Sequence, residues 1–158
     1  MFNGKLSETE NKIVSFHNRY SLELLQIIMK DNKQTNIVLS PYGILTILMI
    51  IINGSKGILK EEMLKKMDLN EQEIEKEEGQ ESIIYLNEYW QKLESLLNYT
   101  SNMITVRTAN SLWIKKEDNI NETFSEITKK YFNLTIEKVD FSSKEDIDKI
   151  CNIIKENI

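Results

Sequence analysis

The sequence predicts a mainly helical chain with a few strands, and three observations lead to that prediction. Five stretches carry apolar residues at helical spacing, and several of them begin at a residue that caps helices well. Residues 44–52 are apolar at every position except Thr46, which predicts a helix with no solvent-facing side. Segments 103–116 and 134–141 are rich in strand-forming residues.

The first predicted helix opens at Ser7 and Glu10, which form a capping box. It continues to about residue 31, and its inner face follows helical spacing: Ile13, Phe16, Tyr20, Leu24 and Ile27. We expect residues 36–39 to form a short strand before the next helix.

The apolar helix has clear ends in the sequence. Ser40 is a good N-cap, and Pro41 stands at the first helical position, where its missing N–H costs nothing. Asn53 and Gly54 provide a left-handed stop. The helix that follows is expected to bury Leu59, Met63 and Met67.

An acidic stretch and a strong amphipathic helix come next. Residues 71–81 hold six Glu and one Lys, which is typical of an exposed connection; an acidic binding site is the less favoured alternative. The one basic residue between Ser82 and Asn98 is Lys92. Apolar residues recur there at helical spacing: Ile83, Leu86, Trp90, Leu93 and Leu97.

Two strands and two helices complete the predicted order. Segment 103–116 carries apolar residues at both odd and even positions, so both faces of an extended chain would be apolar, which indicates a strand covered on both faces. Segment 134–141 is the second predicted strand. Between them Asn121 caps a helix whose inner face is Phe124, Ile127 and Tyr131. Ser142 and Glu145 form a capping box for the last helix. Its apolar stripe is Ile147, Ile150, Cys151, Ile154 and Ile158.

Length and composition fit one domain of an ordinary globular protein. The 158 residues are 41% hydrophobic and 28% charged, so they can bury a core. A net charge of −5 argues against nucleic acid or an anionic membrane as a partner. One cysteine excludes an internal disulfide. The N-terminus lacks the basic and apolar regions of a secretory signal, so we expect a cytoplasmic protein, or an extracellular one if the gene start is incomplete.

The sequence offers no catalytic, metal-binding or cofactor-binding set of residues. His17, the only histidine, is expected at the edge of an apolar helix face. Cys151 lies on the apolar face of the last helix, where a buried thiol is inert. Asp146 and Asp148 are two residues apart and therefore face different ways on a helix. We expect neither enzyme activity nor a cofactor.

Three motifs occur in an order and spacing shared with a known family. In residues 36–66, N-I-V-L-S-P-Y-G opens the apolar helix, and G-S-K-G with an amphipathic helix follows it. T-A-N-S-L-W at 108–113 and V-D-F at 139–141 come later. These motifs resemble the serpin family of protease inhibitors. The resemblance implies an α+β serpin fold, of which 1–158 would be the N-terminal part: mainly helical, with two strands of the main sheet.

The resemblance also gives single residues structural roles. It places one group beneath the main sheet, in the region that shifts when the sheet opens: Asn36, Ser40 and Pro41. It places another in a strand of that sheet: Thr108, Ala109, Asn110 and Leu112. The chain departs from the family at Gly43 and Leu59, where a serine and a capping threonine are usual. In residues 150–158 the Asn, Trp and Thr of the family pattern are missing at the positions where the family has them.

The function that the resemblance implies depends on parts beyond these motifs. A complete serpin inhibits a serine or cysteine protease as a suicide substrate: the protease cleaves an exposed reactive loop, which then inserts into the main sheet. This chain holds no reactive loop, so we expect a serpin-family protein that is incomplete and inactive as an isolated chain. The alternatives are a noninhibitory binding module and a gene remnant.

Two expectations about partners follow. Heparin-activated serpins carry a basic cluster where this chain has Lys92 alone, which argues against heparin. The strand at 103–116 has at most one neighbour in the chain, and exposed apolar strand edges promote association. We therefore expect the isolated chain to self-associate or to bind a chaperone.

Overall fold

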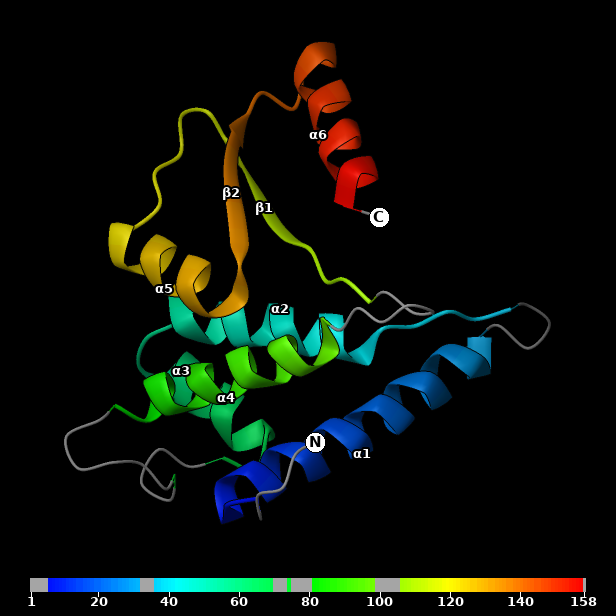
Figure 1. Ribbon diagram of the computed structural model, residues 1–158, viewed down its shortest axis with the longest axis vertical. Helices are drawn as coiled ribbons and strands as arrows, with labels where there is room; N and C mark the ends of the chain where they lie inside the picture. Colours follow the sequence, from blue (N-terminus) through cyan, green and yellow to red (C-terminus); the bar gives the residue numbers. More distant parts are fainter. Residues whose placement is uncertain (1–5, 32–35, 70–73, 75–80, 99–105, 158) are drawn as a thin grey trace. The chain divides into compact units, whose positions relative to one another are not determined.

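The computed structural model describes residues 6–31, 36–69, 74, 81–98 and 106–157 (Figure 1). It divides into two units, residues 1–86 and 87–158. Along the chain the elements are α1 (Glu8–Asp31), α2 (Pro41–Gly54), α3 (Ile58–Lys66), α4 (Ser82–Leu97), β1 (Asn110–Lys115), α5 (Glu122–Phe132), β2 (Leu134–Val139) and α6 (Lys144–Asn157). This order agrees with the sequence prediction except for one strand.

Helix α1 starts as predicted but buries only part of its apolar face. The Ser7 N–H donates to Glu10 Oε2 at 2.9 Å, and the Glu10 N–H donates to Ser7 Oγ at 3.1 Å, so the capping box is present. Ile13 and Phe16 are 2% and 7% exposed. Ile27, predicted on the inner face, is 59% exposed, because the buried contacts of α1 lie in its first half.

Residues 36–40 form no regular structure, so the predicted strand at 36–39 is wrong. A strand requires a hydrogen-bonded neighbour, and in the described part of the chain the one ladder joins β1 to β2. Val38 is 99% exposed in consequence.

Helix α2 is buried on one side and exposed on the other, which corrects the prediction of a helix without a solvent-facing side. Ile47 and Ile51, one turn apart, are 55% and 45% exposed. The neighbours of α2 within its unit are α1 and α3, which cover one side of the helix. The buried residues are Leu45, Thr46, Met49, Ile50 and Ile52.

The left-handed stop predicted at the end of α2 is absent. Gly54 remains helical, and the next residue, Ser55, is extended. Asn53 Nδ2 donates to the Met49 carbonyl at 2.9 Å, and the Ser55 N–H donates to the Ile52 carbonyl at 3.1 Å. The Ser55 N–H thereby satisfies the Ile52 carbonyl, one of the end carbonyls that a left-handed residue would otherwise help to satisfy.

Helix α3 begins without a side-chain cap, as the loss of the capping threonine predicts. Its N-cap is Gly57, the residue directly before the helix, whereas the family pattern has its capping threonine at position 59. Leu59, expected to be buried, is 59% exposed, whereas Leu64 and Met67 are 2% and 3% exposed. Met67 is therefore buried as predicted and Met63 is half-buried, whereas Leu64 is buried in place of Leu59.

Helix α4 follows the predicted pattern through most of its length. Ile83, Leu86 and Trp90 are 9%, 1% and 1% exposed, although Leu97 at the end is 40% exposed. The acidic connection at 71–81 lies largely outside the described residues; within it, Ile74 is 5% exposed.

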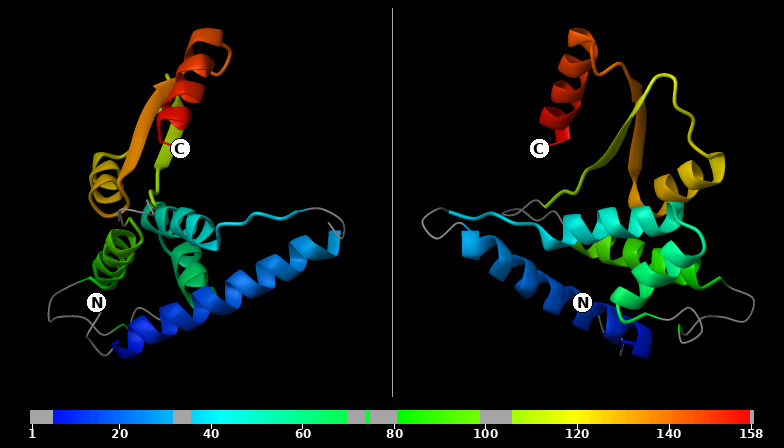
Figure 2. Two further views of the ribbon diagram at one scale, coloured as in Figure 1. Left: turned by 45° about the vertical axis from the view of Figure 1, so that its right-hand side comes forward. Right: turned by 180° about the vertical axis from the view of Figure 1, so that it is seen from behind.

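The second unit contains a parallel pair of strands, which both views of Figure 2 show side by side. Asn110 pairs with Leu134 and the register continues to Lys115 and Val139. β1 is shorter than the predicted 103–116, because β2 offers six residues for pairing; residues 103–105 lie outside the described part. No β1 residue is fully buried, so the expected cover on both faces is not found.

Helix α5 connects the two strands and is capped at both ends. Asn121 Oδ1 accepts the Phe124 N–H at 3.1 Å, as predicted. Asn133 ends the helix in the left-handed region with φ 48°, which Asn tolerates better than most residues. Tyr131 and Phe132 in the last turn are 5% and 0% exposed, so α5 is anchored by apolar burial.

Helix α6 differs from its prediction in its cap and in its apolar stripe. The N-cap is Ser143, whose Oγ accepts the Asp146 N–H at 3.4 Å, one residue later than the predicted box at Ser142. Ile147 and Ile154 are 43% and 44% exposed, and Cys151 is exposed rather than buried. Ile150 of the predicted stripe is half-buried, and Ile158 lies outside the described residues.

Candidate functional site: the motif residues and the polar cluster at the strand ends

The residues predicted beneath a sheet lie at the start of α2. Ser40 Oγ accepts the Gly43 N–H at 3.3 Å, and Pro41 occupies the first turn. A Cβ at position 43 would lie 3.3 Å from Ser40 Oγ, so Gly43 leaves the hydroxyl room to cap the helix. Asn36 is exposed. A role for these residues in sheet opening stays a prediction.

The strand motif is tied to two neighbouring helices by side-chain hydrogen bonds. The Thr108 N–H donates to Asn98 Oδ1 at 2.7 Å, and its hydroxyl donates to Glu94 Oε1 at 2.8 Å. Asn110 Nδ2 donates to the Phe132 carbonyl at 3.0 Å. The Thr and Asn of T-A-N therefore fix the start of β1 against the end of α4 and the end of α5.

A cavity of about 290 Å³ opens beside this motif. Ala109 and two other motif residues reach it, whereas Leu112 lies further along β1, in register with Ile136. The lining contains no charged side chain and is formed by Thr108, Ala109, Asn110, Ser111, Asn133, Thr135, Ile153 and Ile154.

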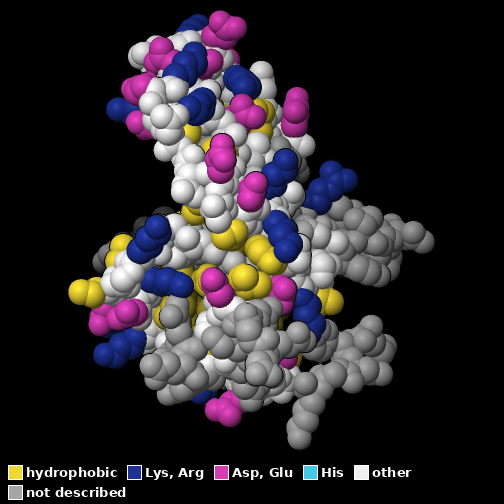
Figure 3. All heavy atoms as spheres, turned by 90° about the vertical axis from the view of Figure 1, so that its left-hand side faces the viewer, with side chains coloured by type: hydrophobic (Ala, Val, Ile, Leu, Met, Phe, Trp, Pro, Cys, Tyr) yellow, Lys and Arg dark blue, Asp and Glu magenta, His cyan; other side chains and the backbone are white. Residues whose placement is uncertain are grey.

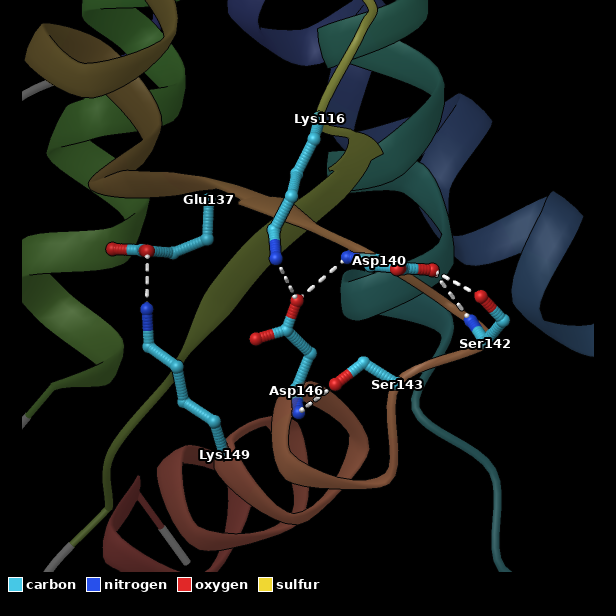
Figure 4. Close-up of polar contacts among 7 residues, drawn as sticks. All are labelled: Lys116, Glu137, Asp140, Ser142, Ser143, Asp146 and Lys149. Atoms are coloured by element: carbon cyan, nitrogen blue, oxygen red, sulfur yellow. Dashed lines mark hydrogen bonds and ion pairs between the residues drawn. The ribbon is translucent and has the colours of Figure 1, made fainter.

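A polar cluster lies at the opposite ends of the strands, where α6 begins (Figure 4). Asp146 Oδ2 accepts Lys116 Nζ at 2.8 Å and the Asp140 N–H at 2.7 Å. Asp140 Oδ1 accepts both the N–H and the hydroxyl of Ser142. Asp146 therefore joins the residue after β1, the residue after β2 and the first turn of α6.

Hydrogen bonds and the Lys116 charge outweigh the repulsion between the two carboxylates of this cluster. Hydrogen bonds from Lys116 and from the Asp140 N–H lower the pKa of Asp146, and the bonds from Ser142 lower the pKa of Asp140. The Asp146 carboxylate in turn raises the pKa of Lys116. Acidic and basic side chains alternate around this end of the unit (Figure 3), so the cluster forms no patch of one sign.

The structure gives no support for catalysis. No group of three or more His, Cys, Asp or Glu among the described residues could hold a metal ion. His17 is half-buried at the edge of its helix face, as predicted, and burial lowers its pKa. No helix of the described part is long and apolar enough to cross a membrane.

Sequence reasoning missed two buried polar residues of α4. Asn87 is 0% exposed and Glu94 is 8% exposed. The signal was present: Asn87 lies four residues after Ile83, and Glu94 lies four residues after Trp90, so both share the apolar face. A polar residue in phase with an apolar stripe is expected to be hydrogen-bonded, and Glu94 does accept Thr108.

Comparison with known proteins shows the family that the sequence motifs resemble. Residues 15–158 match the family model Serpin (serine protease inhibitor). Mouse plasminogen activator inhibitor 2, macrophage, is 26% identical over 164 residues, covering 86% of this chain and 40% of that protein.

Solved structures show the same fold. Native protease nexin-1 with heparin aligns with a TM-score of 0.72 at 21% identity, over 90% of this chain and 36% of that one. Human thyroxine-binding globulin complexed with its hormone aligns with a TM-score of 0.73 at 18% identity, over 92% and 37%. The chain thus spans about two fifths of its relatives' length. It belongs to the serpin family, as a partial serpin with a mainly helical α+β fold.

Proposed function

We propose that residues 1–158 supply the N-terminal part of a serpin that inhibits a serine or cysteine protease as a suicide substrate, and that the 158 residues alone do not inhibit. The observation that carries this proposal is the family match over 15–158, together with the parallel pair β1–β2 built around T-A-N. Insertion of a cleaved loop requires a sheet that opens between strands, and the described part contains a two-stranded sheet.

The test is incubation of the 158-residue chain with trypsin-, chymotrypsin- and papain-like proteases, followed by a denaturing gel. We expect no covalent adduct, because the chain offers no reactive loop that could acylate the nucleophile of the protease. A complete inhibitory serpin in parallel shows that each protease is competent. An adduct with the 158-residue chain would contradict the proposal.

A noninhibitory binding module is the second candidate, and the exposed apolar side chains favour it. Leu22, Ile47 and Ile51 are 63%, 55% and 45% exposed, and Ile47 and Ile51 lie one turn apart on α2, so they offer apolar area to a partner. Its partner is a second copy or a chaperone rather than heparin, since Lys92 is the one basic residue of α4. Retention on a heparin column at physiological salt would contradict this part. We propose the cytoplasm as the location of the protein, or the cell exterior if the gene start is incomplete.

A further inference from the structure

Helix α6 is docked in a different way from α5, although both belong to the second unit. Ile147 and Ile154 of α6 are 43% and 44% exposed, whereas Tyr131 and Phe132 of α5 are 5% and 0% exposed. Burial of apolar area is the main favourable contribution to helix docking. α6 therefore gains much less from burial than α5 does.

Hydrogen bonds and ion pairs, rather than apolar burial, join α6 to the rest of its unit. Asp146 accepts Lys116 Nζ at 2.8 Å and the Asp140 N–H at 2.7 Å (Figure 4). One turn further along α6, Lys149 Nζ lies 2.9 Å from Glu137 Oε2 of β2. The cations of both ion pairs are open to solvent, since the side chains of Lys116 and Lys149 are 58% and 51% exposed.

We propose that these ties act as an electrostatic latch, and that added salt releases α6 from the strands while α5 stays in place. The latch is defined as the contacts of Asp146 with Lys116 and Asp140, and of Lys149 with Glu137. Release of α6 uncovers the cavity wall formed by β1 and β2, because Ile153 and Ile154 of α6 form part of the lining.

Added salt weakens the ion pairs that hold α6 but not the apolar burial that holds α5. The Debye length falls from about 30 Å at 0.01 M ionic strength to about 3 Å at 1 M, so exposed ion pairs lose most of their attraction. Apolar burial is not weakened in this way. Asp140 and Glu145 are the other charges that act on Lys116, and both are acidic, whereas Asp146 is also stabilised by the charge of Lys149.

Hydrogen–deuterium exchange of the full chain at pH 7 tests the proposal. Between 0.01 M and 0.5 M sodium chloride we expect exchange in α6 to become about three- to tenfold faster. Exchange in α5 should change by less than about twofold, because Phe132 and Tyr131 hold it. Equal changes in both helices, or no change in α6, would overturn the proposal.

A matched pair of variants isolates Asp146. Asp146→Asn keeps the shape of the side chain but removes its charge, and should give faster α6 exchange at low salt and a smaller response to salt than the parent, because the Lys149–Glu137 pair remains. Asp148→Asn makes the same change of charge two residues away, at an exposed side chain that makes no ion pair in the described part, and should behave like the parent.

One outcome of the variant experiment would overturn the latch, and a second would be decided by the salt titration of the parent. Asp146→Asn and Asp148→Asn could prove equal, in which case the response reflects net charge alone. If Asp146→Asn also loses protection in α5, the salt titration of the parent decides: selective loss in α6 supports the latch, and joint loss of α5 and α6 overturns it.

Discussion

Replacing Leu45 by alanine tests the packing of α2 most directly, because neighbouring positions on this helix differ sharply in burial. Leu45 is 0% exposed, whereas Ile47, two residues later, is 55% exposed. The two side chains carry the same number of carbon atoms, and both substitutions produce alanine. Ile47→Ala is therefore a matched control for the change in helix propensity and in side-chain size.

The expected magnitudes follow from these exposures. Leu45→Ala removes three carbons from full burial, about 2.4 kcal/mol at ~0.8 kcal/mol per group, and the cavity left behind raises the cost to about 3–5 kcal/mol. At Ile47 roughly half of that area is already in water, and alanine is the better helix former, so the loss should stay below about 1 kcal/mol.

Urea unfolding followed by far-ultraviolet circular dichroism measures the global loss of stability. Hydrogen exchange across residues 41–54 reports the same change locally, including in a chain that unfolds unit by unit. We expect a much larger effect for Leu45→Ala in both measurements. Equal effects of the two variants would refute the assignment of the buried face of α2, and a larger effect at Ile47 would place that residue against a partner.

Three further predictions concern the cap of α5, pH and association. Asn121→Ala should lower the free energy of unfolding by about 1 kcal/mol and raise hydrogen exchange at the start of α5, because the Phe124 N–H loses its acceptor. Asn121→Asp should retain the cap, so equal effects of the two variants would contradict this role of Asn121. The pKa values of Asp140 and Asp146 are lowered by folding, so their stabilisation is present above the ordinary value of 3.8 and is lost as the pH falls through the lowered values. The protection of α6, which is the intrinsic exchange rate at a given pH divided by the observed rate, should therefore be constant from about pH 7 to 5 and fall below about pH 4, and a midpoint near neutrality would contradict the sign. Size-exclusion chromatography with light scattering should give a mass above 18.6 kDa, with binding of an apolar dye; a monomer that binds no dye would contradict self-association.

Local signals in the sequence predicted most elements of the fold. Ser7 with Glu10, Ser40 before Pro41, and Asn121 each cap a helix through contacts within three residues. Such contacts depend on the identity of a few neighbouring side chains, so they can be read without a tertiary model. The T-A-N motif likewise located β1, although its partners on α4 and α5 were not predicted.

Burial could not be predicted to the same extent, because it depends on what covers a face rather than on the face itself. Ile47, Leu59 and Cys151 are apolar residues in phase with a helix, yet all three are exposed in this chain. The strand expected at 36–39 failed for a related reason: strand-forming residues become a strand only when a neighbour pairs with them.

The sequence by itself determined the order of the helices, the N-caps of α1, α2 and α5, and membership of the serpin family, since these follow from local chemistry and from motifs at fixed spacing. The tertiary structure alone decided which side of each helix is covered, where β1 ends, and that Asp146 joins Lys116 to the Asp140 N–H. Those features bring together groups that lie six to thirty residues apart in the chain, and their pairing is fixed by the geometry of the packed elements rather than by any one segment.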